Sequence, residues 1–284
     1  MDRRSRIAAL MSPPALFLVI FFLLPMVIMA SFSFRAGSFG AARSQFTLEH
    51  YRQFARSTSF QYLLLRSVGV ALETSIYCVL LAYPVAYFLT FRGGPRRLSL
   101  LTVLLAPAWT SFLLRVLAWK LILGSEGLVS SFLQMAGLIQ EPTPILLYSR
   151  SAVVVALVYS WLPFVAMPIF SALERIDRNL LDAAADLGCP PWKAFLRVTL
   201  PLSLPGVVAG FVFVFIPTLG EWVTPALVGG VQGTMYGNII QDQFARALNW
   251  PMGSLMSLVM LALMLVLMAL FGRFVGLADL LGGG

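Results

Sequence analysis

Long apolar stretches alternate with short polar loops along most of this chain. Each stretch is close to or above the length of about 17 to 25 residues that crosses the hydrocarbon core of a bilayer as a helix. Six such stretches occur, at 13–34, 67–91, 98–114, 151–173, 204–219 and 253–271. We therefore expect an all-α integral membrane protein with six transmembrane helices, organised as one transmembrane domain over residues 1–284.

Composition agrees with this pattern and excludes a soluble domain. Hydrophobic residues make up 59% of the chain and charged residues only 11%, with a mean hydropathy of +0.87. A soluble domain usually carries about 25% charged residues. The two cysteines, Cys78 in an apolar stretch and Cys189 in a polar loop, are too few and too differently placed for a disulfide framework, so we expect two free thiols.

The basic residues indicate the orientation of the chain. The formal net charge is +8, but Lys and Arg flank the apolar stretches and form neither a patch nor a basic helical stripe, which argues against nucleic acid as a partner. Arginines are densest before the first stretch and in the short loop at 92–97. Such loops remain in the cytoplasm, so with six spans we expect both termini to be cytoplasmic.

The first stretch begins like a secretory signal, because Arg3, Arg4 and Arg6 precede it. Its apolar run is too long and no convincing small-x-small cleavage site follows, so we expect it to be retained as a span.

Three further segments outside the spans have helical or turn character. We expect a helical loop at 47–65, a short apolar helix or re-entrant piece at 127–139, and a helix at 235–248 that follows a flexible Gly-Gly break at 228–231. The lone histidine, His50, lies in the first of these loops with no set of ligands around it, and we expect no metal site.

The loop at 174–203 is polar and long enough to hold two short helices. Asn179 is suited to cap the first helix, with Asp182 in its positively polarised first turn. Gly188 supplies the left-handed residue that ends a helix. A helix, a glycine turn and a second helix are therefore predicted.

The second helix of this loop is expected to begin at Pro190-Pro191 and to end at Pro201. Trp192, Phe195 and Leu196 follow the i, i+3, i+4 spacing and share one face of it. A partner protein explains such an apolar face most simply. Two alternatives remain open: the face lies on lipid headgroups, or it folds back under the spans. A DNA-binding helix-turn-helix does not fit, because spans tether both ends and the acids balance the bases.

The same loop carries a spaced motif. It reads Asp182-Ala183-Ala184, three residues, Gly188, nine residues, Val198, one residue and Leu200-Pro201. This resembles the Glu-Ala-Ala-x3-Gly-x9-Ile-x-Leu-Pro loop of permease subunits of ATP-binding-cassette importers, with Asp for Glu and Val for Ile. The stretches 107–119 and 215–225, and Asn249-Trp250-Pro251, are similar to the spermidine/putrescine branch of that family.

The resemblance implies a type I importer fold in the bacterial inner membrane, with the loop docked as a coupling helix in a groove of a cytoplasmic ATPase subunit. The implied partners are ATPase subunits, a second permease that is related or identical, a periplasmic substrate-binding protein and the lipid bilayer. The residues expected to dock are Asp182, Ala183, Ala184, Gly188, Trp192, Phe195, Leu196, Leu200 and Pro201.

The chain is not expected to hydrolyse ATP. No Gly-x4-Gly-Lys-Ser/Thr motif occurs, and the only lysines are Lys120 and Lys193. We expect no cofactor and no catalytic residue in this chain.

Glu73 is a candidate for the substrate pathway. It lies seven residues inside the second predicted span, roughly 10 Å deep at 1.5 Å per residue. A carboxylate at that depth needs a partner or water, and often faces a cavity. It is suited to attract a polycation; the structural alternative is an ion pair with a residue such as Arg115, or a hydroxyl partner.

Aromatic and acidic residues near the outer ends of the spans are the other candidates. Glu221 and Trp222 combine a charge with an aromatic face that suits ammonium groups. An interfacial tryptophan beside a solvated acid is an equally simple interpretation. Trp109 is a further candidate, although Trp109, Trp119 and Trp161 are more typical of packing or of the membrane interface.

The sequence is also compatible with other functions. The loop motif reports the ATPase and not the cargo, so the same role for sulfate, ferric iron or thiamine is an alternative. A membrane-embedded enzyme would need polar groups that converge at depth, and Glu73 stands almost alone. A secondary transporter more often shows internal repeats and has no use for an apolar cytoplasmic loop.

Overall fold

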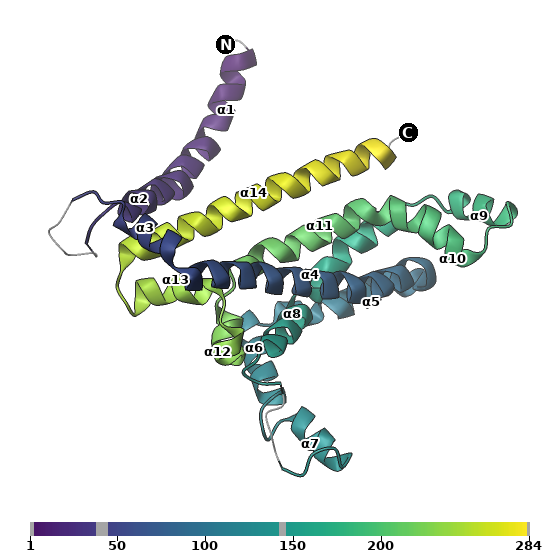
Figure 1. The fold of residues 1–284 in the computed structure, drawn as a ribbon. Coiled ribbons are helices and arrows are strands. Elements are labelled where there is room, and N and C mark those ends of the chain that lie inside the picture. Colours follow the sequence, from purple (N-terminus) through teal and green to yellow (C-terminus); the bar gives the residue numbers. More distant parts are fainter. Residues whose placement is uncertain (1–2, 38–44, 142–145, 283–284) are drawn as a thin grey trace. The chain divides into compact units, whose positions relative to one another are not determined.

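The computed structural model describes residues 3–37, 45–141 and 146–282, with side chains described from Leu10 to Gly272 within these ranges. Helices follow one another along this part of the chain, and it contains no β-strand (Figure 1). The all-α fold is therefore confirmed. Helices suit a bilayer because they satisfy every backbone N–H and C=O within one segment.

The chain divides into two compact units, 1–61 with 239–262, and 62–238 with 263–284, and three of the described helices cross a boundary between them. In chain order the helices are α1 (Arg3–Leu18), η1 (Val19–Leu23), α2 (Leu24–Ser33), α3 (Glu49–Arg56), α4 (Thr58–Arg92), η2 (Gly94–Arg96), α5 (Arg97–Leu105), η3 (Ala106–Trp109), α6 (Phe112–Ile122), α7 (Leu128–Met135), α8 (Arg150–Glu174), α9 (Arg178–Asp186), α10 (Pro191–Ala194), η4 (Phe195–Thr199), α11 (Leu200–Leu219), η5 (Pro225–Gly229), α12 (Gly230–Gly233), α13 (Tyr236–Ala245) and α14 (Trp250–Gly282).

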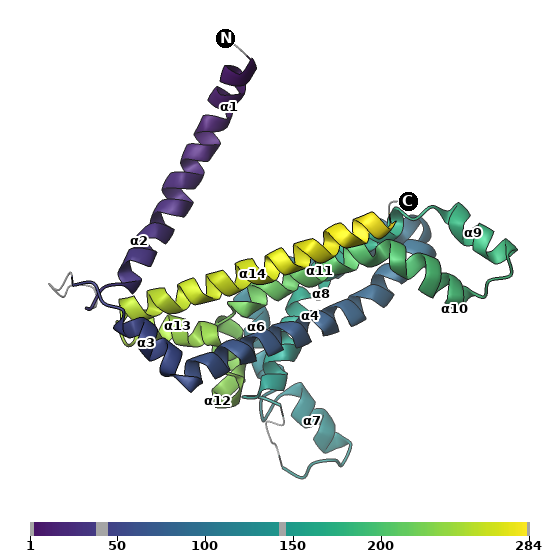
Figure 2. The ribbon, with the colours of Figure 1, turned by 45° about the horizontal axis from the view of Figure 1, so that its top comes forward.

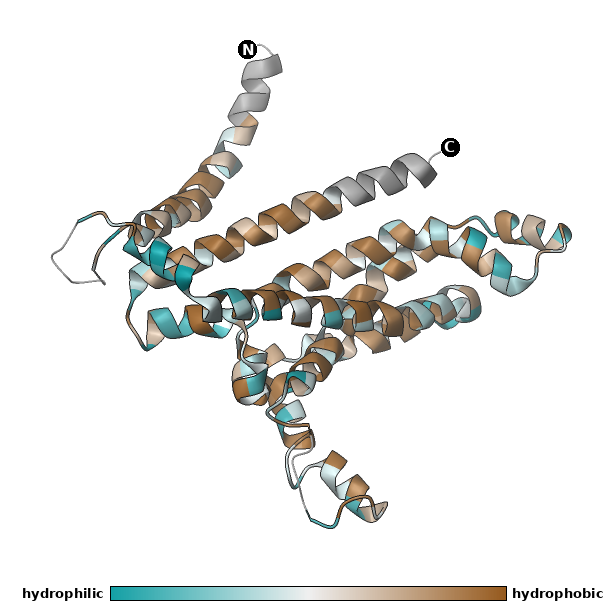
Figure 3. Ribbon diagram, viewed as in Figure 1, coloured by the Kyte–Doolittle hydropathy of each residue, from teal (hydrophilic) through white to brown (hydrophobic). Residues whose placement is uncertain are grey.

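Five helices among the described residues are long and apolar enough to cross a membrane, and a bent pair makes a sixth candidate. The five are Leu10–Ser33, Thr58–Arg92, Arg150–Glu174, Pro191–Leu219 and Trp250–Gly272. Figure 3 shows apolar residues along α11 and the first part of α14 and polar residues on α3. Each predicted stretch thus corresponds to a helix or to the bent pair.

The third predicted span, 98–114, is not one straight helix. Gly94–Trp109 and Phe112–Ile122 meet at an angle of 85°. Pro107 lies in the 3-10 turn before the break, and Thr110 and Ser111 have extended backbone that no helix accommodates. An apolar run alone does not reveal this bend, because both arms are equally hydrophobic.

Between the spans, helices occur where the sequence predicts them, but their first and last residues differ from the predicted ones. The expected loop at 47–65 is the short helix α3 followed directly by the start of α4, which begins at Thr58. Helices α7 and α13 occur where the sequence predicts them. Between them in the chain, Gly230 at the predicted break adopts φ +56°, a backbone conformation that favours glycine.

The first unit is held by aromatic contacts near the ends of its helices. The Tyr51 hydroxyl hydrogen-bonds with the Ser33 Oγ at 2.8 Å, and the Tyr51 ring stacks on Phe34. Trp250, at the start of α14, packs edge-to-face on Phe244 of α13. Trp250 is therefore held by contacts within the protein.

The second unit is built around α8 and α11, which lie side by side (Figures 1 and 2). A Cβ on Gly206 would overlap that of Ala172 and lie 2.5 Å from the carbonyl oxygen of Pro168, and one on Gly210 would lie 3.0 Å from Val165 Cγ1. Small residues let two membrane helices approach this closely. Hydrophobic side chains of α8 from Ala152 to Leu173 fill the surrounding core.

We predict that Gly206→Ala destabilises the protein by about 1 to 3 kcal/mol, because the added methyl must push α8 and α11 apart. The matched control is Gly272→Ala, where no atom lies within 4 Å of the new methyl group. Thermal unfolding of the detergent-solubilised protein measures both. Equal melting temperatures for the two variants would contradict the tight packing.

Candidate functional site

The loop at 174–203 folds as two short helices joined by a glycine turn, as the sequence predicts. Gly188 follows α9 with φ +72°, and Pro191 is the first residue of α10. The cap differs from the prediction: Asp177, not Asn179, precedes the helix, and its carboxylate accepts the backbone N–H of Asn179 at 3.0 Å. Asp177 takes the role because its backbone is extended while Asn179 already lies inside the first turn.

The prediction that Pro201 ends the second helix is wrong. The chain runs from α10 through the π-turn η4 directly into α11, so that Pro191–Leu219 forms one apolar helix of 29 residues. Pro201 is the second residue of α11 and follows the wide π-turn immediately. A π-turn alters the backbone ladder locally and so accommodates a residue that has no N–H. The second helix of the loop and the fifth span are therefore one continuous element.

The predicted apolar face of this helix is divided between two environments. Trp192 and Leu196 are exposed, with 61% and 49% of their surface accessible, as is Leu187 at the glycine turn. Phe195 instead packs edge-on against Tyr83 and Tyr87 of α4, at ring distances of 5.8 and 5.7 Å. Phe195 thus joins the loop to its own bundle, whereas Trp192 stays exposed with the Lys193 ammonium 5.3 Å from the centroid of its ring.

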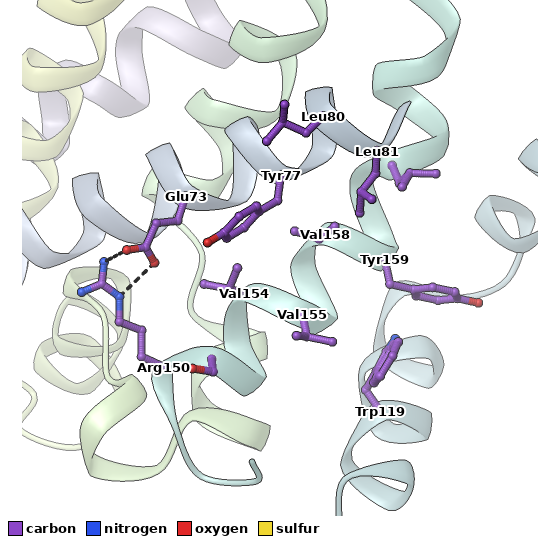
Figure 4. Close-up of a pocket in the computed structure, with 12 residues that line it drawn as sticks. Glu73, Tyr77, Leu80, Leu81, Trp119, Arg150, Val154, Val155, Val158 and Tyr159 are labelled. Atoms are coloured by element: carbon purple, nitrogen blue, oxygen red, sulfur yellow. Dashed lines mark hydrogen bonds and ion pairs between the residues drawn. The ribbon is translucent and has the colours of Figure 1, made fainter. Parts of the chain in front are cut away.

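Glu73 forms a two-pronged ion pair with Arg150 and not with Arg115. Arg150 Nη2 and Nε donate to the two carboxylate oxygens at 2.7 and 3.1 Å (Figure 4). Arg150 is the first residue of α8, so Glu73 is paired with the end of that helix. Arg115 Nη1 donates to the carbonyl of Ser160 instead. The sequence therefore correctly predicts an ion pair as one alternative for Glu73, but the partner is Arg150 and not Arg115.

This ion pair lies at one end of an open pocket of about 900 Å³ between α4, α6 and α8. Tyr77 follows Glu73 on α4, and the Trp119 and Tyr159 rings, in edge contact at 5.5 Å, lie at the other end (Figure 4). Pockets of about 300 to 1,000 Å³ are typical of small-molecule sites. The remaining lining residues are mainly aliphatic: Leu80, Leu81, Val154, Val155, Val158 and Leu162.

Sequence reasoning missed Arg150, Tyr77 and Tyr159 as parts of this site. The one available signal was that Arg150 stands at the start of an apolar stretch that otherwise holds no charge. Nothing in the linear pattern shows that Glu73 and Arg150, 77 positions apart, lie at the same level.

The other pathway candidates do not line the pocket of Glu73. Glu221 follows the end of α11 and accepts the backbone N–H groups of Val223 and Thr224 at 2.9 and 3.1 Å. Burial raises the pKa of the Glu221 carboxyl above its usual value, and these hydrogen bonds oppose the shift. Trp222 is exposed, and its carbonyl accepts the side-chain amide of Asn238. Glu221 therefore caps the helical segment that begins at Val223.

Glu221 also borders a smaller cavity of about 270 Å³, which Arg115 and Trp161 line as well. Trp109 is highly exposed beside the bend between α5 and α6. These sites are separate from the larger pocket.

A family model described as binding-protein-dependent transport system inner membrane component matches residues 4–279. The chain belongs to this family. It is the permease of a type I ABC importer, a multi-pass inner-membrane protein. The ATPase of such importers is a separate subunit, so this permease is not itself an enzyme.

Relatives of this permease are similar over nearly their whole length. The spermidine/putrescine transport system permease protein PotB of Salmonella typhimurium strain SL1344 is 36% identical over 258 residues, 90% of this chain and 89% of that protein. PotB of Escherichia coli K12 is 35% identical over 90% of this chain and 93% of its own. PotB of Haemophilus influenzae is 34% identical over the same shares as the Salmonella protein.

Solved structures of ABC importers share the fold of this permease. A chain of a bacterial transporter that imports the acidic polysaccharide alginate has a TM-score of 0.72 at 16% identity, covering 96% of both chains. A chain of the MetNI methionine transporter has a TM-score of 0.55 at 19% identity, covering 78% of this chain and 99% of that one. At these identities the likeness concerns the fold.

We predict that Glu221→Ala destabilises this permease by about 1 to 3 kcal/mol, because two backbone N–H groups then lose their acceptor. Glu221→Gln keeps an acceptor oxygen and should retain most of the stability. The melting temperatures of the purified proteins distinguish the variants. An alanine variant as stable as the glutamine variant would show that Glu221 is not a cap.

Proposed function

We propose that this chain is a permease subunit of an ATP-driven polyamine importer of the spermidine/putrescine type. The observation that carries the proposal is the 36% identity to a spermidine/putrescine permease over 90% of the chain. The pocket supports it chemically, because one carboxylate and several aromatic faces suit a flexible chain of ammonium groups.

The proposed assembly contains two ATPase subunits, a second permease and a periplasmic binding protein. Both termini of this chain and the loop at 174–203 lie in the cytoplasm, in agreement with the dense arginine clusters. The pocket of Glu73 then lies toward the periplasm, because α8 runs from Arg150 to Glu174 just before the loop. Its 25 residues separate the two sites by about 37 Å.

In this mechanism, ATP-driven closure of the ATPases moves the loop, and the helices convert that movement into alternating openings. Trp192 and Leu196 supply the exposed apolar surface that an ATPase groove covers. The unbroken helix from Pro191 to Leu219 passes the movement on. Phe195, held by Tyr83 and Tyr87, makes α4 follow it.

Uptake in proteoliposomes tests the proposed cargo. The complete complex, with its ATPases, second permease and binding protein, should accumulate radiolabelled spermidine or putrescine only when ATP is enclosed on the ATPase side. Unlabelled sulfate, ferric iron, thiamine and molybdate should not compete. ATP-dependent uptake of one of those solutes without uptake of either polyamine would replace the polyamine assignment.

We predict that Trp192→Asp weakens the copurification of the ATPase by about tenfold or more, since burial of such a side chain is worth about 1.5 to 3 kcal/mol. Gly188→Asp should act in the same direction, because φ +72° strains a residue that has a Cβ. Met135→Asp on α7, also highly exposed, is the matched control. Normal ATPase recovery with both loop variants would refute docking at this helix.

A further inference from the structure

The Glu73–Arg150 ion pair is open to exchange. About two fifths of each side chain is accessible, 43% for Glu73 and 41% for Arg150, so the pair is not sealed inside the protein. Both side chains also line the open pocket, so a cation that enters the pocket has access to the Glu73 carboxylate. A second cation that reaches Glu73 through the pocket therefore competes with Arg150 for the carboxylate.

Gly69 makes room for the arginine. It lies one helical turn before Glu73 on α4, and a Cβ there would lie 3.0 Å from Arg150 Nη2. Glycine is unfavourable in the interior of a helix, and a positive φ does not explain it here. The missing side chain at Gly69 instead lets the guanidinium come close to α4 while it pairs with Glu73.

Arg150 itself lies in an unfavourable place for a cation. It is the first residue of α8, where the unpaired N–H groups of the helix carry a partial positive charge. Glu73 offsets both that partial charge and the guanidinium. If a cargo ammonium takes Glu73, the long arginine side chain is free to leave the carboxylate.

The far end of the pocket favours cargo with more than one charge. The rings of Trp119 and Tyr159 line the pocket at the end away from the ion pair, and Tyr77 follows Glu73 along α4 (Figure 4). A cation above the face of such a ring is attracted to it. A linear polyamine can therefore displace the arginine with one ammonium and rest another on the aromatic rings, whereas a monovalent ion gains only the first contact.

We infer that Arg150 is a built-in counter-ion for Glu73, which cargo must displace and which thereby sets the affinity and the polycation selectivity of this pocket. The inference rests on the proposed function, since it names how the polyamine would be held. Arg150 competes with cargo, while Glu73 binds it.

The test is equilibrium binding of radiolabelled spermidine to the complete permease–ATPase complex without its binding protein, both nucleotide-free and trapped with ATP and vanadate. Arg150→Gln should lower the Kd by about two- to fivefold, the factor that corresponds to a partly exposed ion pair. Glu73→Gln should raise the Kd. The double variant should bind like Glu73→Gln, because the arginine acts only through the carboxylate.

A lower Kd in Arg150→Gln together with a higher Kd in Glu73→Gln would distinguish a counter-ion from a purely structural ion pair. If the pair merely joined α4 to α8, both single variants would lower stability and neither would tighten binding. Arg150→Lys keeps the charge but loses the two-pronged contact, so it should lower the Kd to a smaller extent; it serves if Arg150→Gln fails to assemble. In Arg150→Gln, Na⁺ should also compete with spermidine more strongly than in the wild-type complex.

Arg97→Gln is the matched control. Arg97 pairs with Glu174, at the other end of α8, at 2.7 Å and with similar exposure. Its loss should leave the Kd unchanged. An unchanged or higher Kd in Arg150→Gln and Arg150→Lys, or no saturable binding to the wild-type complex in either state, would overturn the inference. Polyamine uptake by the wild-type complex would still support the proposed function, and loss of that uptake is what would remove it.

Discussion

The close approach of α8 and α11 is the contact on which the rest of the second unit depends. Gly206 and Gly210 bring the backbone of α11 against Ala172, Pro168 and Val165, with no space for another methyl group at Gly206. In a bilayer, lipid tails are as apolar as the side chains, so helices associate through tight packing and not through exclusion of water. Two helices matched this closely have few alternative arrangements.

This contact relates the two candidate sites. The helix α8 begins with Arg150 at the pocket and ends shortly before the loop, and α11 continues from that loop without a break. The α4 helix connects the same two sites. Its residues Glu73 and Tyr77 line the pocket. Further along α4, Tyr83 hydrogen-bonds with Ser203 of α11 at 2.9 Å, and the Tyr83 and Tyr87 rings pack against Phe195. A displacement of the loop therefore acts on all three helices that position the ion pair or its partners.

The sequence predicts the features that depend on local composition. Apolar length indicates the spans, and Gly188 and Pro191 indicate the turn and the start of the second helix, because each requires one backbone geometry. The sequence does not predict features that depend on the conformation of adjacent residues. Pro201 continues a helix because a π-turn precedes it, the third span bends at Thr110 and Ser111, and the cap is Asp177, two residues before the expected Asn179.

In the candidate site, too, the sequence indicates single residues but not their contacts with distant segments. Glu73 stands out in the sequence as a charge within an apolar stretch, but its partner could not be identified without the relative height of α4 and α8. Phe195 has the spacing of an exposed face, and only the tyrosines of α4 show that it packs inward. Glu221 resembles a pathway acid until its hydrogen bonds to the backbone of 223 and 224 are seen.

The most direct test of the account is whether α8 and α11 move as one body during the ATP cycle. Spin labels at Met167 on α8 and Leu204 on α11, both exposed, report the distance between these helices by electron–electron dipolar spectroscopy of the assembled complex. We expect the same distance distribution without nucleotide and after trapping with ATP and vanadate. A shift of several ångströms between the two states would contradict a rigid pairing of α8 with α11.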